Sequence, residues 1–179
     1  GRLVADDDPA VQKAATAALL EPVGHVPTRI VARLLGSQDK AVRAQPAVLC
    51  LAGDGETLRS ARRVLGTGPP LDALYEHLPA AARRGASVGT LTPYIDRLLR
   101  SRDYQCWEVA ARTVEALGPV GAPYASRMLR LLRYPDGGEE HPEMIASGAA
   151  AGALQSMGDA GRRALERGVR SANEWTRCR

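Results

Sequence analysis

Histidine and cysteine, the side chains that most often bind metals or act as nucleophiles, are rare in this sequence, which has three of each. Two histidines follow a glutamate, in Glu76-His77 and Glu140-His141, whereas His25 has no acidic neighbour. A carboxylate beside an imidazole is a ligand pair that divalent transition metals accept. The acidic residues around His141 are, however, typical of a solvated loop, and we predict no metal site.

The cysteines and the glycine-rich stretches carry no recognisable catalytic pattern. Cys50, Cys106 and Cys178 are widely spaced and form no CxxC pair, which argues against a disulfide framework and a zinc site. There is no GxSxG, P-loop or GxGxxG motif, and the glycines at 53 and 55 lie in a stretch too short to hold a phosphate. We therefore predict a protein that is not an enzyme and needs no cofactor.

Arginine is the abundant residue in this sequence that could bind a ligand. The sequence has 22 Arg against two Lys and a net charge of +4. Guanidinium groups bind carboxylates and phosphates, so arginines that share one surface would bind an anionic partner. The codon usage of a genome rich in G and C would explain the number of arginines, but it would not explain where they lie.

A sequence repeat predicts where the arginines lie in the fold. A Val or Ile precedes a Gly by thirteen residues at Val11/Gly24, Val42/Gly55 and Ile145/Gly158, and by twelve at Val109/Gly121. A period of roughly 30–37 residues is typical of stacked helix pairs. We expect one domain over 1–179 with five helix pairs at about 5–36, 37–67, 68–102, 103–138 and 139–173.

Each unit has the pattern of two helices joined by a glycine turn, and no stretch has the alternation of a β-strand. In the last unit, Leu165 and Val169 are the apolar positions of the second helix. The third unit fits worst: Pro79 is expected to interrupt its first helix, residues 83–89 to form a long linker, and Thr92-Pro93 to open the next helix. The chain lacks Phe, so its core depends on Ala, Leu and Val, which let helices approach closely.

These units resemble HEAT repeats, and more closely the short HEAT-like repeats of phycobilin lyases. The resemblance rests on an Asp start followed by Val-Arg, on paired Ala, and on Ala-Leu-Gly before a turn. It is carried by residues 39–43, by residues 116–123, and by Val11 with Ala14-Ala15 and Ala18-Leu19. It covers four of the five units and implies an all-α, right-handed α-solenoid whose second helices line the concave surface.

If the second helices line one surface, most of the arginines lie there. Fourteen fall on predicted second helices: Arg29, Arg33, Arg59, Arg62, Arg63, Arg97, Arg100, Arg127, Arg130, Arg133, Arg162, Arg163, Arg167 and Arg170. Glu56, Asp96 and Glu166 are the acidic residues of the same helices. All of these arginines except Arg162 are our candidate residues for binding an anion or a partner.

Two explanations of this concentration remain open. The arginines form a binding surface for nucleic acid, an acidic peptide or a phosphorylated partner. Alternatively, arginines near helix C-termini, such as Arg33, Arg100 and Arg133, complement the helix dipole and solvate an exposed face. Trp107 and the tyrosines would stack on nucleic-acid bases, but ordinary packing of these rings at repeat junctions is the favoured interpretation.

Two enzyme families with a similar architecture offer no motif to transfer. Alkylpurine DNA glycosylases require a catalytic Asp among aromatic groove residues; Asp96 has Tyr94 nearby, but no motif matches. Deoxyhypusine hydroxylases bind iron through His-Glu dipeptides, which occur here only in the reverse order.

We therefore predict a non-catalytic interaction scaffold whose partner is another protein or another domain of the same chain. The alternative is binding of nucleic acid or another polyanion through the arginine-lined face. A third hypothesis, from family analogy alone, is a lyase-like accessory role in prosthetic-group attachment. No secretory segment or membrane-spanning apolar run is present, so we expect a cytoplasmic protein. Because the chain begins at Gly1, we expect it to be a fragment of a longer protein; its oligomeric state stays open.

Overall fold

The computed structural model describes Ala44, Ala47, Val48 and residues 50–53, 55–66, 71–132 and 142–177. Within these ranges every regular element is a helix and none is a β-strand, which confirms the all-α prediction. The chain divides into two compact units, Gly1–Ala86 and Ser87–Arg179. The division falls inside the third predicted repeat, and the first predicted repeat lies outside the described residues.

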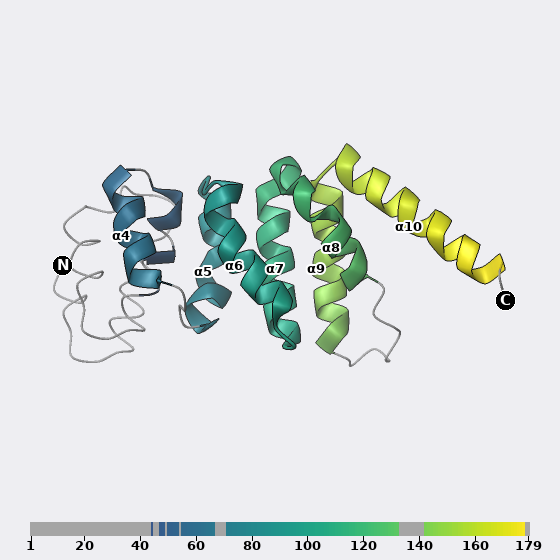
Figure 1. Ribbon diagram of the computed structural model, residues 1–179, viewed down its shortest axis with the longest axis horizontal. Helices are drawn as coiled ribbons and strands as arrows, with labels where there is room; N and C mark the ends of the chain where they lie inside the picture. Colours follow the sequence, from purple (N-terminus) through teal and green to yellow (C-terminus); the bar gives the residue numbers. More distant parts are fainter. Residues whose placement is uncertain are drawn as a thin grey trace. The chain divides into compact units, whose positions relative to one another are not determined.

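In the first unit, the short 3-10 helix η2 (Cys50–Ala52) precedes α4 (Gly55–Leu65) and α5 (Leu71–Arg83) (Figure 1). η2 packs against both helices. Gly66 ends α4 with a φ of +53°, a left-handed conformation that favours glycine, and its N–H donates to the carbonyl of Arg62 at 2.9 Å. The side chains buried between these elements include Leu51, Ala61, Leu65, Leu74 and Leu78.

Pro79 and Pro93 of the third predicted repeat lie inside helices, which contradicts our prediction that they mark helix boundaries. α5 continues past Pro79 to Arg83, and Pro79 itself is buried. Burial of the ring offsets part of the cost of the hydrogen bond that proline cannot donate. The linker is also shorter than predicted, because α6 (Val88–Arg100) begins well before Pro93. Ser87 fixes this start, since its Oγ accepts a hydrogen bond from the Thr90 N–H at 3.2 Å.

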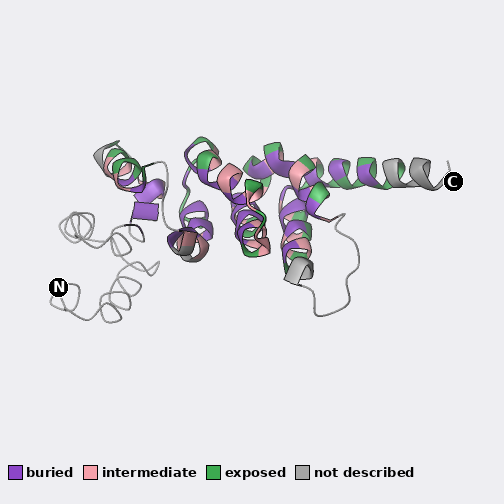
Figure 2. Ribbon diagram, turned by 60° about the horizontal axis from the view of Figure 1, so that its bottom comes forward, coloured by how far each residue is buried: buried purple, intermediate pink, exposed green. Residues whose placement is uncertain are grey.

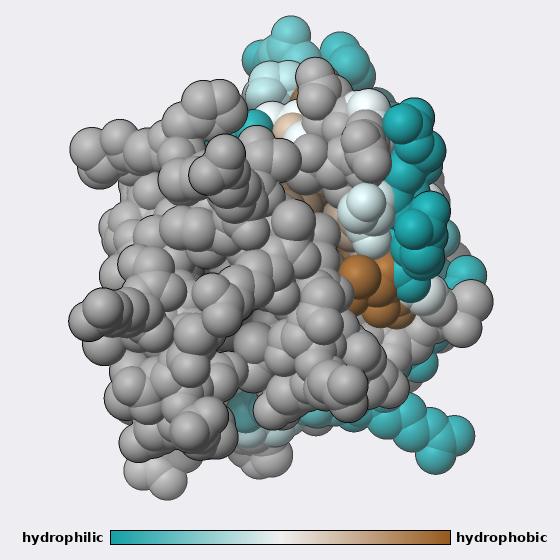
Figure 3. Space-filling view, turned by 90° about the vertical axis from the view of Figure 1, so that its left-hand side faces the viewer, coloured by the Kyte–Doolittle hydropathy of each residue, from teal (hydrophilic) through white to brown (hydrophobic). Residues whose placement is uncertain are grey.

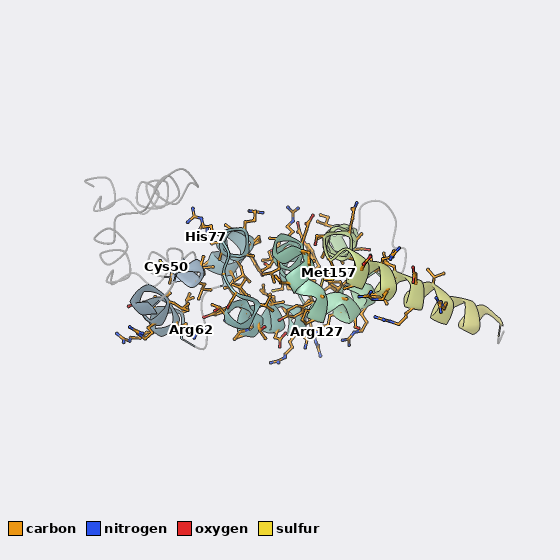
Figure 4. All side chains as sticks on the ribbon, turned by 90° about the horizontal axis from the view of Figure 1, so that it is seen from above. Cys50, Arg62, His77, Arg127 and Met157 are labelled. Carbon is orange, nitrogen blue, oxygen red and sulfur yellow. The ribbon has the colours of Figure 1, made fainter. Side chains whose placement is uncertain are left out.

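The second unit contains α6, α7 (Tyr104–Leu117), the 3-10 helix η3 (Gly118–Tyr124), α8 (Ala125–Leu131), α9 (Pro142–Ser156) and α10 (Asp159–Arg177). Seen from above, α7 and α9 form one row and α6 and α8 form the other (Figure 4). The closest packing is between α7 and α9, and α6 packs on α7 as α8 packs on α9. The polar stretch between α8 and α9 lies outside the described residues.

The boundaries of α7 agree with the sequence pattern. Asp103 caps its first turn by accepting from the Gln105 N–H at 2.9 Å, and Gly118 follows its last turn with a φ of +58°. Cys106, Ala110 and Val114 of this helix are fully buried. Small residues on α9, among them Ala146, Ala150 and Ala153, are buried as well. Small side chains on these facing helices allow the close approach that the composition predicts.

In the last helix pair the structure buries different residues from those that the repeat pattern indicates. Ile145 is 52% exposed, while its neighbour Ala146 is buried. Leu165 and Val169 of α10 are 39% and 61% exposed, while Ala164 is buried. Figure 2 shows buried and exposed residues along opposite sides of α10. The reason is steric: α10 lies so close to α9 that a Cβ on Gly161 would sit 1.7 Å from the Leu154 carbonyl oxygen, so only small residues fit there.

Candidate anion-binding groove

An ion pair between α6 and α8 positions the charged residues of the candidate site. Asp96 and Arg100 lie one turn apart on α6, and Arg127 and Arg130 lie one turn apart on α8. Arg127 Nη1 donates to Asp96 Oδ1 across the two helices. Arg100 Nη2 lies 3.9 Å from Asp96 Oδ2, so the same carboxylate faces a second guanidinium group.

Tyr124 provides a second link between the same parts of the chain. Its hydroxyl donates to Thr92 Oγ1 at 3.1 Å, and Thr92 in turn donates to the Val88 carbonyl at 2.9 Å. Arg127 Cζ lies 5.6 Å from the centre of the Tyr124 ring, within the range of a cation–π contact. Burial of the phenol is the main reason why the pKa of Tyr124 is raised; Asp96 raises it further, and the Thr92 hydrogen bond and Arg127 lower it. Tyr124 therefore stays protonated at neutral pH and keeps its donor.

A cavity of about 400 Å³ opens beside this ion pair. It is lined by Asp96, Leu99, Arg100, Trp107, Arg127, Arg130 and Leu131, which we call the α6/α8 groove. Three guanidinium groups face one carboxylate, so the groove has a positive charge at neutral pH. Leu99, Trp107 and Leu131 supply apolar surface, and the Trp107 indole is held in place because its Nε1–H donates to the Ser101 carbonyl at 2.8 Å. The groove combines cationic groups with apolar contact area.

The structure brings together three of the arginines that the sequence singles out. Arg100, Arg127 and Arg130 line the groove, whereas Arg97 lies on α6 but does not line it. The remaining described candidates lie on other helices, and all are exposed: Arg59, Arg62 and Arg63 on α4, and Arg163, Arg167 and Arg170 on α10. Arg29, Arg33 and Arg133 lie outside the described residues.

The arginines of α4 belong to the first unit, whereas the α6/α8 groove belongs to the second unit. Arg62 and Arg63 lie in the last turn of α4. Figure 3, turned so that the left-hand side of Figure 1 faces the viewer, shows a strongly hydrophilic strip among the described atoms. Arginines in the last turn of a helix, such as Arg62 and Arg63, complement the helix dipole.

The helix-dipole explanation accounts for part of the groove but not for Arg127. Arg97, Arg100 and Arg130 lie in the last turns of α6 and α8, where a positive charge is stabilised by the helix dipole. Arg127 is the third residue of α8, at the end of a helix where the dipole disfavours a cation. Its position is explained by the Asp96 carboxylate and the Tyr124 ring, so it belongs to the tertiary arrangement of the groove.

Sequence reasoning misses the apolar half of the site. The sequence pattern predicts that Trp107 only packs at a repeat junction, but the packing of α6 on α7 places its indole beside three arginines. Spacing of one turn predicts that Asp96 faces Arg100. The contact between Asp96 and Arg127, 31 residues apart, depends on tertiary packing, and no local signal predicts it.

Metal-binding and nucleophilic groups do not gather elsewhere in the described ranges. No group of three or more His, Cys, Asp or Glu residues able to hold a metal ion occurs there. Glu76-His77 lies on α5, and His25 and His141 lie outside those ranges. Cys50 and Cys106 are buried, and neither forms a disulfide. Burial raises the pKa of the Cys50 thiol, with Arg84 opposing, and a raised pKa makes a thiol less nucleophilic at neutral pH.

No helix in the described residues is long and apolar enough to cross a membrane. The sequence and the structure match no protein-family model, no curated protein and no solved structure.

Proposed function

We propose that this chain is a HEAT-like helical-repeat scaffold that binds an acidic segment of a protein partner in the α6/α8 groove. The observation that carries the proposal is the placement of Arg100, Arg127 and Arg130 over an apolar surface in a cavity of about 400 Å³. A pocket of this size takes a few side chains. The expected ligand is therefore a short stretch of chain, with carboxylates for the arginines and apolar groups for the surface below them.

The arrangement of helices in the second unit supports the repeat interpretation. α6 with α7 and α8 with α9 are packed neighbours, and the four helices lie in two rows (Figure 4). Glycines with a left-handed φ follow α7 and α9, at Gly118 and Gly158. Helix pairs in two rows are the arrangement expected of stacked repeats, whose exposed rows commonly bind partners.

The ion pair inside the groove favours a carboxylate ligand. Arg127 already binds the Asp96 carboxylate, and its geometry therefore suits this group. Arg100 and Arg130 are exposed and extend the positive charge beyond Asp96. An acidic peptide would pair with these two arginines and cover Leu99 and Trp107 with its apolar side chains. Such mixed contacts are typical of peptide recognition, in which charge sets orientation and apolar burial sets affinity.

Nucleic acid is the second candidate, and the position of Trp107 favours it. The indole lies half-buried among three arginines, and bases stack on such rings while arginines contact the backbone. The two candidates differ in salt dependence. Binding to a nucleic-acid backbone releases counterions and weakens steeply with added salt, whereas binding that buries apolar side chains weakens less.

Calorimetric titration separates these candidates. The first probe is a synthetic peptide of about ten residues, about 33 Å when extended, with glutamates, leucines and a central proline that prevents helix formation. The second probe is a random-sequence DNA duplex. The proposal predicts that the peptide binds at moderate salt and that Arg100→Ala/Arg130→Ala weakens it about tenfold or more.

The control variant is Arg83→Ala/Arg112→Ala, which removes the same charge at two exposed arginines on α5 and α7. It should bind the peptide almost as well as the unmodified chain does. Equal losses in both variants would mean that net charge, and not the groove, attracts the peptide. Tight duplex binding with no peptide binding would favour the nucleic-acid function instead.

A further inference from the structure

Two neighbours hold the guanidinium group of Arg127 in place at the α6/α8 groove. Its Nη1 donates to Asp96 Oδ1, and its Cζ lies 5.6 Å from the centre of the Tyr124 ring. The Arg127 side chain is 41% exposed, whereas that of Arg100 is 80% exposed. A side chain that is already held loses less conformational entropy when it binds a ligand. Arg127 is therefore the better prepared of these two arginines for a contact of defined geometry.

Tyr124 supports Arg127 through both its sequence position and its packing. It immediately precedes α8 with a helical backbone conformation, and residues three apart, such as Tyr124 and Arg127, lie on the same side of a helix. Its ring is buried, and its hydroxyl donates to Thr92 Oγ1 of α6 at 3.1 Å. These contacts fix the ring, which then supports one face of the guanidinium group.

The contact with Asp96 uses only part of the hydrogen-bonding capacity of Arg127. A guanidinium group has five N–H groups on three nitrogens, and Nη1 makes this contact. The N–H groups of Nε and Nη2 take no part in it, and Arg127 lines the cavity. Two N–H groups on one edge of a guanidinium bind a carboxylate through two parallel hydrogen bonds. Arg127 can therefore bind a ligand carboxylate while it keeps its contact with Asp96.

We infer that Arg127 determines the specificity of the α6/α8 groove and that Tyr124 is its positioning residue. The inference rests on the proposed function, the binding of an acidic segment in this groove. Arg127 binds one ligand carboxylate through two parallel hydrogen bonds, and the Tyr124 ring holds the guanidinium plane in the orientation that these bonds need. Arg100 and Arg130, which are exposed, attract the other acidic groups of the ligand through their charge.

Two lysine substitutions on α8 test the role of Arg127, because both keep the positive charge. Calorimetry uses the full 179-residue chain and the peptide of glutamates, leucines and proline. Arg127→Lys should weaken binding about tenfold, since an ammonium group lacks the planar pair of donors. The matched control is Arg130→Lys, one turn along the same helix, which should change the affinity by no more than about twofold.

A second pair of variants tests the role of Tyr124. Tyr124→Phe keeps the ring and should bind the peptide within about twofold of the unmodified chain, whereas Tyr124→Leu removes the ring and should bind about fivefold more weakly. A tyrosine with a structural role alone would lower the melting temperature in both variants and leave the affinity of the folded chain unchanged. Circular dichroism checks that each variant is folded at the temperature of the titration.

The outcomes separate this inference from the proposed function. Equal affinities of Arg127→Lys and Arg130→Lys would overturn the inference and leave the groove as the binding site. Unchanged affinity in a folded Tyr124→Leu would also overturn it. If Tyr124→Leu does not fold, the lysine pair decides the inference alone. Absence of peptide binding to the unmodified chain would instead overturn the proposed function and this inference together.

Discussion

Asp96 on α6 and Arg127 on α8 form an ion pair that joins two helices of the same row, 31 residues apart in the sequence. The pair is partly solvated, since the Asp96 side chain is 21% exposed and that of Arg127 is 41% exposed. The ion pair therefore contributes little to stability. Its main effect is on the groove: it holds Arg127 at the edge of the groove, and it places a carboxylate where an acidic ligand would bind.

Replacing Asp96 should accordingly have opposite effects on stability and on binding. We expect Asp96→Ala to lower the free energy of unfolding by only about 0.5–1 kcal/mol, because half-exposed ion pairs are screened by water. The same change removes the only acidic residue among the described residues that line the groove, so the peptide of glutamates, leucines and proline should bind roughly threefold more tightly at low salt. Urea denaturation and calorimetry measure the two effects. Weaker peptide binding in Asp96→Ala would show that the carboxylate positions the arginines and does not compete with the ligand.

The hydrogen bond between Tyr124 and Thr92 should make a larger contribution than that ion pair, because Tyr124 is buried. We expect Tyr124→Phe to destabilise the second unit by about 1 kcal/mol. A double-mutant cycle with Thr92→Val checks the cause, since the two losses should be less than additive if the two groups share one bond. Additive losses would contradict this assignment.

The same tyrosine predicts a pH dependence at the alkaline end. Burial raises the pKa of Tyr124 in the folded chain, whereas the unfolded chain has the ordinary value. The unfolded state therefore loses its phenolic proton first, so stability is fully present below the unfolded pKa of about 10 and declines as the pH rises above it. Denaturation curves at increasing pH should show this decline, and Tyr124→Phe should make it shallower. An identical decline in both proteins would assign it to other groups.

Two glycines in the last helix pair should respond in opposite directions to the same substitution. In Gly161→Ala the new methyl group would meet the Leu154 carbonyl at 1.7 Å, so α9 and α10 must separate; we expect a loss of about 3 kcal/mol or more. At Gly148 of α9 an added methyl group would have no neighbour within 4 Å, so Gly148→Ala should stabilise the helix by about 0.5–1 kcal/mol. Thermal or urea denaturation compares the two. A tolerated Gly161→Ala would contradict the close packing from which the exposure of Leu165 and Val169 follows.

Local signals in the sequence predict part of this fold and fail where packing decides. The boundaries of α7 follow from Asp103 and Gly118, which act within one turn of the helix. Pro79 and Pro93 mislead because proline disfavours the interior of an isolated helix. Burial of the Pro79 ring offsets part of that cost, and the Ser87 cap starts α6 before Pro93. Apolar character alone assigns Ile145, Leu165 and Val169 to the core. The short distance between α9 and α10 excludes large residues from the contact between these helices. The spacing of apolar residues along the sequence does not predict that distance.

The sequence likewise predicts one part of the candidate site and misses the other. The pattern of second helices identifies Arg100, Arg127 and Arg130 as members of one row. It also selects arginines of α10 that do not line the groove. Trp107, from the other row, enters the site only because α6 packs on α7, and so the apolar half of the groove becomes visible only in three dimensions.

The fluorescence of Trp107 tests the central claim most directly, because this indole lies in the groove. Trp175, the only other tryptophan, is replaced by Phe so that the emission reports on Trp107 alone. Titration with the peptide of glutamates, leucines and proline should then shift the emission to shorter wavelength, saturably, as the apolar surface loses water. Arg100→Ala/Arg130→Ala should abolish the shift, and Arg83→Ala/Arg112→Ala should preserve it. Peptide binding in the calorimeter with no change in Trp107 emission would contradict the claim that the α6/α8 groove is the binding site.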